Sequence, residues 1–414
     1  MKILIVNKYY YFRGGAETSA IKQLDLFEKH NHEVRFFSMK HPNNLEYKYE
    51  YYFAPHIDFM DEFNKRTITS KFKVINNIFY STKTRKSFSR LLDDFKPDVI
   101  HVHNFNKHLT ISILFEAKKR HIPVVKTLHD CSMICPSGVF LSHKKICEKC
   151  KSNRLSPIFE KCVKNSTQAS IISTAERLFN DFMGLDKLIN SYISPSKFVK
   201  DKYVEFGYNV NKINVLPNFY PLSNKFGKIK LEKYFLYLGR LSPEKGIKTL
   251  CEAAKLANIN LKIVGDGPLI ESLKSEYSSK NLVFLGYKQG NELKTIRENA
   301  WFTVLPSECY ENNPFSVIES FSDGVPAIGS DIGGIPELIL DDETGFLFEP
   351  RSVSDLAQKL KLANQINSNK RKQLITNAEN LLLSKYDPET HYYKLMKIYN
   401  KVIKENNETN YIRH

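Results

Sequence analysis

Two cations near the middle of the chain could hold a phosphorylated ligand. Arg240 and Lys245 follow the apolar run YFLYL at 234–238 and precede a helix-like stretch at 246–257. A guanidinium can contact two phosphate oxygens at once, and an ammonium adds a mobile point charge. Cations at a strand end beside a helix N-terminus therefore predict a diphosphate site. Ordinary surface cations beside a turn are the alternative.

Two acids lie around the start of another helix-like stretch, at 315–323. Glu311 is in the loop ECYENNP, and Glu319 comes after seven intervening residues, about two turns into the helix. Glutamates at such a loop–helix junction can bind a sugar and a ribose respectively. Two solvated acids are the alternative interpretation.

A glycine pair, Gly14-Gly15, separates the first apolar run from a helix-like stretch at 16–28. Backbone N–H groups and the positive end of a helix make such a loop a ready anion site. The loop lacks the third glycine of GxGxxG, so it does not meet the dinucleotide-binding fingerprint. A tight turn is the other interpretation.

Four of the seven cysteines have a spacing that suits a metal ion. Cys135, Cys147, Cys150 and Cys162 give Cys-x11-Cys-x2-Cys-x11-Cys. Structural zinc favours four thiolates in a tetrahedron, and four thiolates leave no open position for catalysis. The spacing predicts a structural zinc, with free thiols that bind no metal as the alternative.

Charge is unevenly distributed along the chain. Of the formal net charge of +16, residues 1–200 carry +14, whereas residues 301–350 carry −10. Nucleic acid, an anionic membrane surface or a phosphorylated substrate would each suit this excess. Within it, a helix-like stretch presents basic residues opposite an apolar face, which predicts a surface that lies on anionic lipid; a solvated helix face is the alternative. These basic residues are Lys83, Arg85, Lys86 and Arg90.

Strand-like and helix-like stretches alternate along the chain and would position these groups. The first series of strands is expected at 2–6, 32–38, 98–104 and 122–129, and a second series from residue 213, at 213–218, 234–240, 261–267, 282–286, 301–306 and 326–330. Alternation of this kind predicts an α/β protein with two Rossmann-like, doubly wound parallel domains. Ligand sites of such sheets lie at the strand C-termini, so we expect them to face each other across a central cleft.

We expect the first domain at 1–215 and the second at 216–386. The cysteine-rich insert lies at 131–162, and a linker is expected at 220–233. A helix pattern at 387–414 is expected to complete the first domain. The N-terminus has no signal-peptide pattern, and no apolar window approaches the ~18 residues of a membrane span. We therefore expect a cytoplasmic protein whose cysteines are thiols.

Taken together, these elements resemble the family 4 glycosyltransferases, which have the GT-B fold and retain anomeric configuration. The resemblance covers nearly the whole chain. It is to the subset of the family that has a cysteine-rich insert after an HD…CP sequence, and to capsule, exopolysaccharide and O-antigen glycosyltransferases. The motifs in order are GGAE at 14–17, PDVIHVHN at 97–104, LHD at 128–130, LPN at 216–218, LGRLSPEKG at 238–246, VGDGP at 264–268, Glu311-x7-Glu319, GGIPELI at 333–339 and TGFLF at 344–348.

The resemblance implies a role for each matching position. Arg240 and Lys245 would hold the donor diphosphate, Glu311 the donor sugar and Glu319 the ribose, while His129 would lie near the transferring sugar. Gly15 would let the backbone approach the phosphate and the acceptor. The remaining donor-binding positions would be Gly265, Asn313, Pro314 and Phe315.

The implied reaction moves a sugar from a UDP- or GDP-sugar to a saccharide acceptor, often lipid-linked, at the inner face of the membrane. No aspartates are spaced as Asp-x-Asp, so we expect catalysis without a metal, with Arg240, Lys245 and a helix dipole stabilising the leaving group. The alternatives are a GT-B sugar-nucleotide epimerase and, from another class, a zinc-bearing nucleic-acid-binding protein. No nucleic-acid motif is present, so nucleic acid is not an expected partner.

Overall fold

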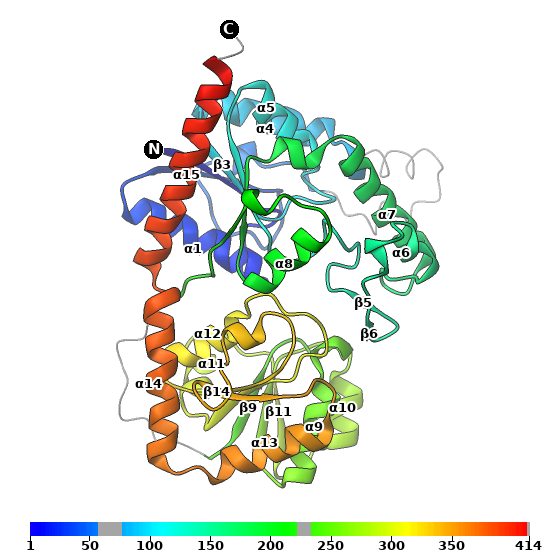
Figure 1. Ribbon diagram of the computed structural model, residues 1–414, viewed down its shortest axis with the longest axis vertical. Helices are drawn as coiled ribbons and strands as arrows, with labels where there is room; N and C mark the ends of the chain where they lie inside the picture. The colour runs from blue at the N-terminus through cyan, green and yellow to red at the C-terminus, as the bar shows by residue number, and fades with distance from the viewer. Residues whose placement is uncertain (57–76, 222–232, 412–414) are drawn as a thin grey trace.

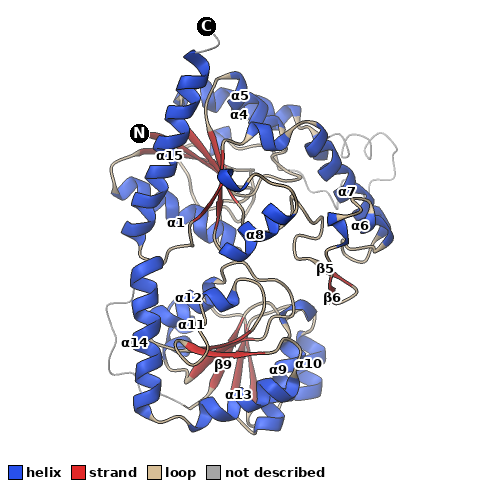
Figure 2. Ribbon diagram, viewed as in Figure 1, coloured by secondary structure: helices blue, strands red, loops and turns tan. Residues whose placement is uncertain are grey.

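The computed structural model describes residues 1–56, 77–221 and 233–411 as two halves, each built on a parallel sheet of six strands (Figures 1 and 2). The first sheet has the order β2-β1-β3-β4-β7-β8. Its strands are β1 (Lys2–Val6), β2 (Glu33–Phe37), β3 (Val99–Val102), β4 (Val124–Thr127), β7 (Ser191–Ser194) and β8 (Ile213–Val215). This sheet and the helices on it are called the N-terminal half.

The second sheet, with the order β11-β10-β9-β12-β13-β14, defines the C-terminal half. Its strands are β9 (Phe235–Leu238), β10 (Leu261–Val264), β11 (Leu282–Gly286), β12 (Phe302–Leu305), β13 (Ala327–Ser330) and β14 (Gly345–Phe348). Both sheets reverse their strand order in the middle, as doubly wound folds do. The predicted fold class, two Rossmann-like domains facing a cleft, is confirmed.

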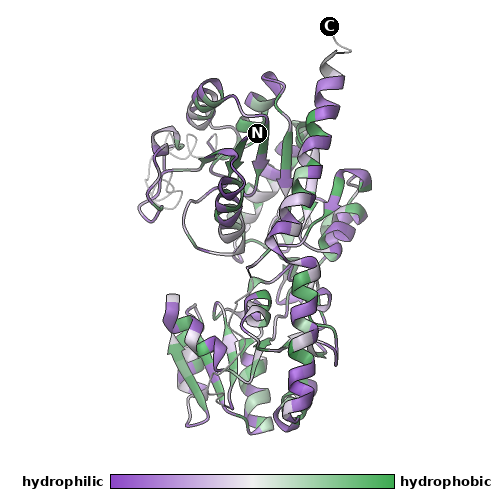
Figure 3. Ribbon diagram, turned by 90° about the vertical axis from the view of Figure 1, so that its left-hand side faces the viewer, coloured by the Kyte–Doolittle hydropathy of each residue, from purple (hydrophilic) through white to green (hydrophobic). Residues whose placement is uncertain are grey.

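Helices cover both faces of each sheet because the strands are apolar on both sides. Those of the N-terminal half are α1 (Gly15–Lys29), α4 (Thr82–Phe95), α5 (Ser112–Lys119), α6 (Ser156–Phe159), α7 (Thr167–Phe182) and α8 (Lys197–Glu205). Those that follow are α9 (Ile247–Ala257), α10 (Ile270–Tyr277), α11 (Gly290–Glu298), α12 (Phe315–Ser322), α13 (Val353–Gln365), α14 (Ser368–Lys385) and α15 (Pro388–Tyr411). In Figure 3 the outer helices carry hydrophobic and hydrophilic residues in turn, as surface helices do.

The last two helices run along one side of both halves (Figure 1). Helix α14 packs on α12, whereas α15 returns to the N-terminal half. Leu395, Tyr399 and Val402 of α15 join Ile3 and Ile5 of β1 in one buried cluster. The chain positions 215 and 386 as domain boundaries stay predictions.

One strand belongs to a different sheet than we expected. The run at 213–218 was predicted to open the second series, but β8 pairs with β7 at the edge of the first sheet. Strand β7 itself was not predicted, because its serines at 191 and 194 interrupt the apolar run on which strand prediction depends.

The predicted insert holds a short hairpin, β5 (Leu141–Ser142) with β6 (Lys145–Ile146), and the helix α6. The hairpin reaches the C-terminal half, where the Arg351 guanidinium donates to the Lys144 carbonyl. Close by, the Tyr310 hydroxyl donates to Glu148 Oε1 at 2.9 Å. The insert therefore links the two halves beside the loop that carries Glu311.

Candidate active site

A cleft of about 590 Å³ lies between the two halves. It is lined by residues that follow the C-terminal ends of strands in both sheets, where ligands of parallel sheets bind. The predicted site residues on its walls are Gly15, His129, Arg240, Lys245, Glu311, Asn313, Pro314 and Phe315. The structure thus brings together eight positions that the sequence analysis drew from separate segments.

The central feature on the C-terminal side of the cleft is an ion pair. Lys245 Nζ lies 2.6 Å from Glu311 Oε1, and the Ser307 hydroxyl donates to the same oxygen at 2.7 Å. Burial by itself would raise the pKa of Glu311, but Lys245 and Ser307 hold that pKa below its usual value. Burial alone would lower the pKa of Lys245, but the negative charge of Glu311 has the larger effect and raises it. Both groups are therefore charged at neutral pH.

The second predicted cation, Arg240, differs from Lys245. Its side chain is exposed, and within the described part of the chain it forms no ion pair. The Tyr237 hydroxyl donates to the Arg240 carbonyl at 2.8 Å, which fixes the backbone beneath it. An exposed guanidinium at the cleft rim can engage an incoming phosphate without breaking an existing contact.

Helix α12 begins at the cleft, directly after the N-cap residue Pro314. Its first backbone N–H groups lack intrahelical partners and point along the helix axis toward the cleft, which favours an anion there. Across the cleft lies the start of α1, where a Cβ on Gly15 would come within 3.2 Å of a Phe315 ring carbon. Gly15 therefore allows the close approach of two helix N-termini from opposite halves.

Two predicted donor-binding residues do not line the cleft. Glu319 lies one turn further along α12, where Arg297 Nη1 donates to its Oε2 at 2.8 Å. Burial raises the pKa of Glu319 in spite of Arg297 and Lys22 nearby. Gly265 has φ +143°, and a Cβ there would lie 1.9 Å from the Gly239 carbonyl oxygen, so it permits the close packing of the loop that precedes Arg240.

On the N-terminal side of the cleft, His129 belongs to a buried histidine network. His129 Nε2 lies 2.6 Å from His103 Nδ1, and His103 Nε2 lies 3.2 Å from Gln23 Oε1. Burial, with a smaller contribution from Lys126, lowers the pKa of His129 to about 3. The imidazole is therefore neutral at physiological pH, and it can act toward a sugar hydroxyl only as a hydrogen-bonding group.

Asn312 joins the two halves beside His129 and was not predicted as a site residue. Its Nδ2 donates to the carbonyls of Leu128 at 2.8 Å and His129 at 3.2 Å, and its Oδ1 accepts from the Ser196 hydroxyl at 2.8 Å. The only sequence signal was its place between Glu311 and Asn313. Asn313 instead turns inward, where its Oδ1 accepts from the Asn218 backbone N–H.

The predicted zinc ligands are only partly gathered. Within the described ranges, no group of three or more His, Cys, Asp or Glu side chains is arranged to hold a metal ion. The Cys150 thiol contacts the Cys135 sulfur and lowers the pKa of Cys135 to about 6. A structural zinc site needs four ligands, of which this contact joins two, and zinc on the four cysteines stays a prediction.

The predicted lipid-binding residues all lie on α4 and are exposed: Lys83, Arg85, Lys86 and Arg90. Phe88, Leu91 and Phe95 on the opposite side of α4 are buried, as the pattern indicated. Arg85 Nε also lies 3.4 Å from Glu116 Oε1, so three cations of this set remain for an external partner in the described structure. No helix in the described part of the chain is long and apolar enough to span a bilayer.

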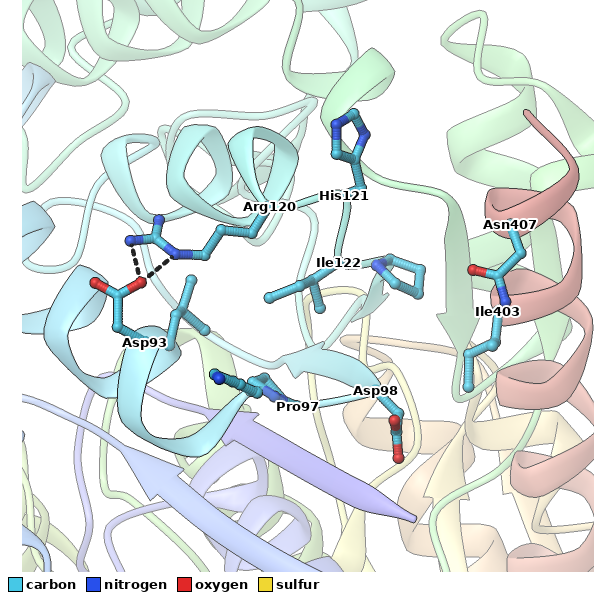
Figure 4. Close-up of a pocket in the computed structure, with 11 residues that line it drawn as sticks. Asp93, Pro97, Asp98, Arg120, His121, Ile122, Ile403 and Asn407 are labelled. Carbon is cyan, nitrogen blue, oxygen red and sulfur yellow. Dashed lines mark hydrogen bonds and ion pairs between the residues drawn. The ribbon is translucent and has the colours of Figure 1, made fainter. Parts of the chain in front are cut away.

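A second cavity, of about 520 Å³, lies at the opposite edge of the first sheet (Figure 4). Its lining includes Pro97 and Asp98, just before β3, and Ile122, just before β4. Arg120 beside it is already paired with Asp93 at 2.8 Å. None of the predicted site residues lines this cavity, so the strand C-termini remain the candidate site.

Two family profiles match the chain. The one described as Glycosyltransferase Family 4 matches residues 13–224, and the one described as Glycosyl transferases group 1 matches residues 221–381. Together they cover both halves and both sides of the cleft.

Curated relatives match over different spans. A Klebsiella pneumoniae protein named "Uncharacterized 42.6 kDa protein in cps region" is 27% identical over 82% of this chain and 87% of its own length. The sulfoquinovosyl transferase SQD2 of Arabidopsis thaliana is 33% identical, but over only 37% of this chain and 30% of its own length. An Escherichia coli UDP-Gal:alpha-D-GlcNAc-diphosphoundecaprenol alpha-1,3-galactosyltransferase is 30% identical over 43% of this chain and 52% of its own.

Solved structures share the fold at low identity. The sucrose-phosphate synthase of Thermosynechococcus elongatus has a TM-score of 0.68 at 17% identity, over 98% of this chain and 99% of its own. HepE of Anabaena, solved with UDP, has a TM-score of 0.63 at 15% identity, over 97% of this chain and all of its own. The profile matches and the two facing sheets together show that this chain belongs to glycosyltransferase family 4 and is a glycosyltransferase with the GT-B fold.

Proposed function

We propose that this glycosyltransferase moves a sugar from a UDP- or GDP-sugar to a saccharide acceptor with retention of anomeric configuration. The observation that carries the proposal is the Lys245–Glu311 pair, which lies beside Arg240 in a cleft whose other side presents His129. The cations suit a diphosphate, and the carboxylate and the neutral imidazole suit sugar hydroxyls. The HepE neighbour is solved with UDP, which supports UDP as a first candidate nucleotide.

The chemistry follows from charge that develops on the leaving group. As the bond between the anomeric carbon and the phosphate oxygen breaks, negative charge grows on the diphosphate, where Arg240, Lys245 and the first N–H groups of α12 can stabilise it. The acceptor oxygen bonds to the anomeric carbon on the same face, and its proton passes to the departing phosphate oxygen. This reaction needs no metal, so activity should survive EDTA; loss with EDTA and recovery only with Mg²⁺ or Mn²⁺ would contradict it.

The acceptor that we propose is a lipid-linked saccharide in the synthesis of a bacterial capsule, exopolysaccharide or O-antigen. Support comes from the names of two relatives, one in a cps region and one that acts on a diphosphoundecaprenol-linked sugar. The protein would then work at the cytoplasmic face of the membrane, with the exposed cations of α4 on anionic lipid. Reversal of Lys83, Lys86 and Arg90 to glutamate should abolish binding to vesicles of anionic lipid; unchanged binding would rule this surface out.

Zinc on the four cysteines stays a proposal based on their spacing alone. Elemental analysis of protein purified without chelator should find about one zinc per chain if the site forms. A content far below that would remove the proposal.

Thermal-shift measurements against UDP- and GDP-sugars test the donor proposal directly. A ligand that binds only the folded state raises the melting temperature by mass action. Arg240→Gln should abolish most of the rise in melting temperature. Lys248 is an exposed cation on α9, and Lys248→Gln should leave that rise unchanged. Stabilisation by no nucleotide sugar would refute the proposal.

Product analysis separates transfer from its alternatives. Release of nucleoside diphosphate only when acceptor is present would exclude an epimerase. The family assignment leaves the nucleic-acid-binding alternative without support.

A further inference from the structure

A side cavity of about 240 Å³ opens from the cleft into the N-terminal half. It shares Asn104, Asp130 and Gly138 with the cleft. Its remaining lining comes from three places: the ends of β1 and β3, the start of the cysteine-rich insert, and the inner face of α7. A group in this cavity would thus lie next to the cleft on the side opposite the Lys245–Glu311 pair.

Three cations line the side cavity: Lys8 after β1, Lys107 after β3 and Arg177 on α7. Among the described residues, none of them forms an ion pair with an acid. Lys107 Nζ donates instead to the Ser173 hydroxyl at 3.2 Å, and Lys8 Nζ lies 4.9 Å from the centre of the Tyr9 ring.

Arg177 is the most informative of the three. Its side chain is buried, with 9% of the residue exposed, and neither Nε nor Nη1 has a hydrogen-bond partner. A buried guanidinium without partners is costly, because each unsatisfied donor loses its water without replacement. Nε and Nη1 lie on different edges of the guanidinium plane, so each is a donor for a separate acceptor oxygen.

The acids that line the side cavity interact electrostatically with these cations but, among the described residues, form no ion pair with them. Asp181 pairs with Arg154 at 3.2 Å, and Asp130 Oδ1 accepts from the Ser132 backbone N–H at 2.8 Å. Glu176 Oε1 accepts from the Lys107 backbone N–H at 2.9 Å, and burial raises the pKa of Glu176 to about 7. At neutral pH this carboxyl is partly protonated, which reduces the negative charge in the cavity.

One further group points to a saccharide that carries the anion. Asn106 donates through Nδ2 to the Ser132 hydroxyl at 3.1 Å, while its buried Oδ1 has no partner. An amide oxygen in this state is an acceptor for a hydroxyl group.

We propose that the side cavity binds an anionic group of the acceptor, a phosphate or a carboxylate, through Arg177, Lys107 and Lys8. This inference rests on the proposed function, because it makes the neighbouring cleft the place of sugar transfer. The group would be either a phosphate that links the acceptor saccharide to its carrier or the carboxylate of an acidic sugar. Binding would orient the acceptor hydroxyl toward the cleft.

Calorimetric titration of the full-length protein tests the inference. The protein is first saturated with UDP, or with GDP if only GDP binds, so that the donor diphosphate site is filled. Inorganic phosphate and glucuronate are then titrated separately, to distinguish a phosphate from a sugar carboxylate. We expect saturable binding of at least one, weakened about tenfold or more in Arg177→Gln and in Lys107→Gln. The control Lys248→Gln removes an exposed cation from α9, in the C-terminal half, and should bind as wild type.

The outcomes separate the two proposals. If nucleotide binds but neither anion does, or if the Arg177 and Lys107 variants bind anions as well as wild type, the inference is wrong and the donor proposal stands. If no nucleotide binds, the donor proposal fails, and anion binding is measured in an Arg240→Gln background, where loss on the further Arg177→Gln change supports the cavity on its own. In turnover assays the same variants should raise KM for the acceptor and leave KM for the donor unchanged.

Discussion

The half-buried Glu311 and the buried Glu176, which belong to opposite halves of the molecule, have opposite electrostatic states. Glu311, in the C-terminal half, is paired with Lys245, which holds its pKa below the usual value. Glu176, in the N-terminal half, accepts a backbone N–H from Lys107, and burial raises its pKa to about 7. The Lys107 ammonium contacts Ser173 instead of Glu176.

This difference distinguishes a preassembled pair from a set of available cations. Lys245 and Glu311 orient each other, so both are in place before a donor arrives. A donor diphosphate must then share the Lys245 ammonium with Glu311. Lys8, Lys107 and Arg177 form no such pair within the described residues and keep their attraction for an external anion. Four experiments test this difference.

The largest effect is expected from Lys245→Met, which removes the cation and leaves Glu311 without its counterion. We expect kcat/KM for transfer to fall on the order of 10²–10³-fold, because the leaving diphosphate loses a preorganised charge. Steady-state kinetics with saturating acceptor measure this. The matched change Lys248→Met, three residues further on the exposed face of α9, should stay near wild type; an equal loss there would point to general damage.

A smaller effect is expected on stability from Glu311→Gln. The folded-state pKa of Glu311 lies below its unfolded value, so its contribution is present above the unfolded pKa of 4.5 and is lost as pH falls through the folded value. Urea unfolding at pH 7 should show a loss of about 1–3 kcal/mol in the free energy of unfolding, and this loss should shrink as pH falls below 4.5. A difference that is independent of pH would contradict the ion-pair explanation. Glu292→Gln, on an exposed acid of α11, serves as the control.

The corresponding change in the N-terminal half, Glu176→Gln, should show the opposite pH dependence. Its folded-state pKa of about 7 lies above the unfolded 4.5, so its contribution is complete below pH 4.5 and is lost as pH rises through 7. Between pH 5 and pH 8, the free energy of unfolding of the variant should therefore rise by about 1–2 kcal/mol relative to that of the wild type. The same urea series measures this difference. If the variant instead became more stable relative to wild type toward low pH, the contrast between the two glutamates would be wrong.

The smallest effect is expected from Tyr310→Phe, which removes the hydrogen bond from the loop before Glu311 to Glu148 of the insert. We expect a loss of about 0.5–1.5 kcal/mol in the free energy of unfolding, as for one hydrogen bond at a partly buried site. Phe198→Leu, beside the same ring, tests whether packing alone explains the loss. A large fall in transfer activity in Tyr310→Phe would show that the insert also controls the donor side.

The sequence predicted the strands that are buried on both faces. The runs at 2–6, 234–240 and 261–267 each contain a short, mainly apolar stretch, and these stretches form β1, β9 and β10. It missed β7, whose serines break the run, and assigned 213–218 to the wrong series, because strand pairing depends on neighbours far along the chain.

The candidate site was predicted in part, for the same reason. Motif residues at strand ends, such as Arg240 and His129, do line the cleft, because the fold places all strand ends there. Asn312 carried no separate signal, since its role depends on carbonyls of the other half, 183 and 184 residues away. Glu319 matched a motif, yet its side chain turns to Arg297.

The amino-acid sequence by itself determined the order of elements, the two doubly wound halves and the family, because apolar runs and strand-end motifs are local patterns. Only the tertiary structure decided which charges meet. It joined Lys245 to Glu311 across 66 residues and left Nε and Nη1 of the buried Arg177 without a hydrogen-bond partner beside the cleft. An ion pair requires two atoms within a few ångströms, and that distance is set by the packing of several elements at once, which no local pattern encodes.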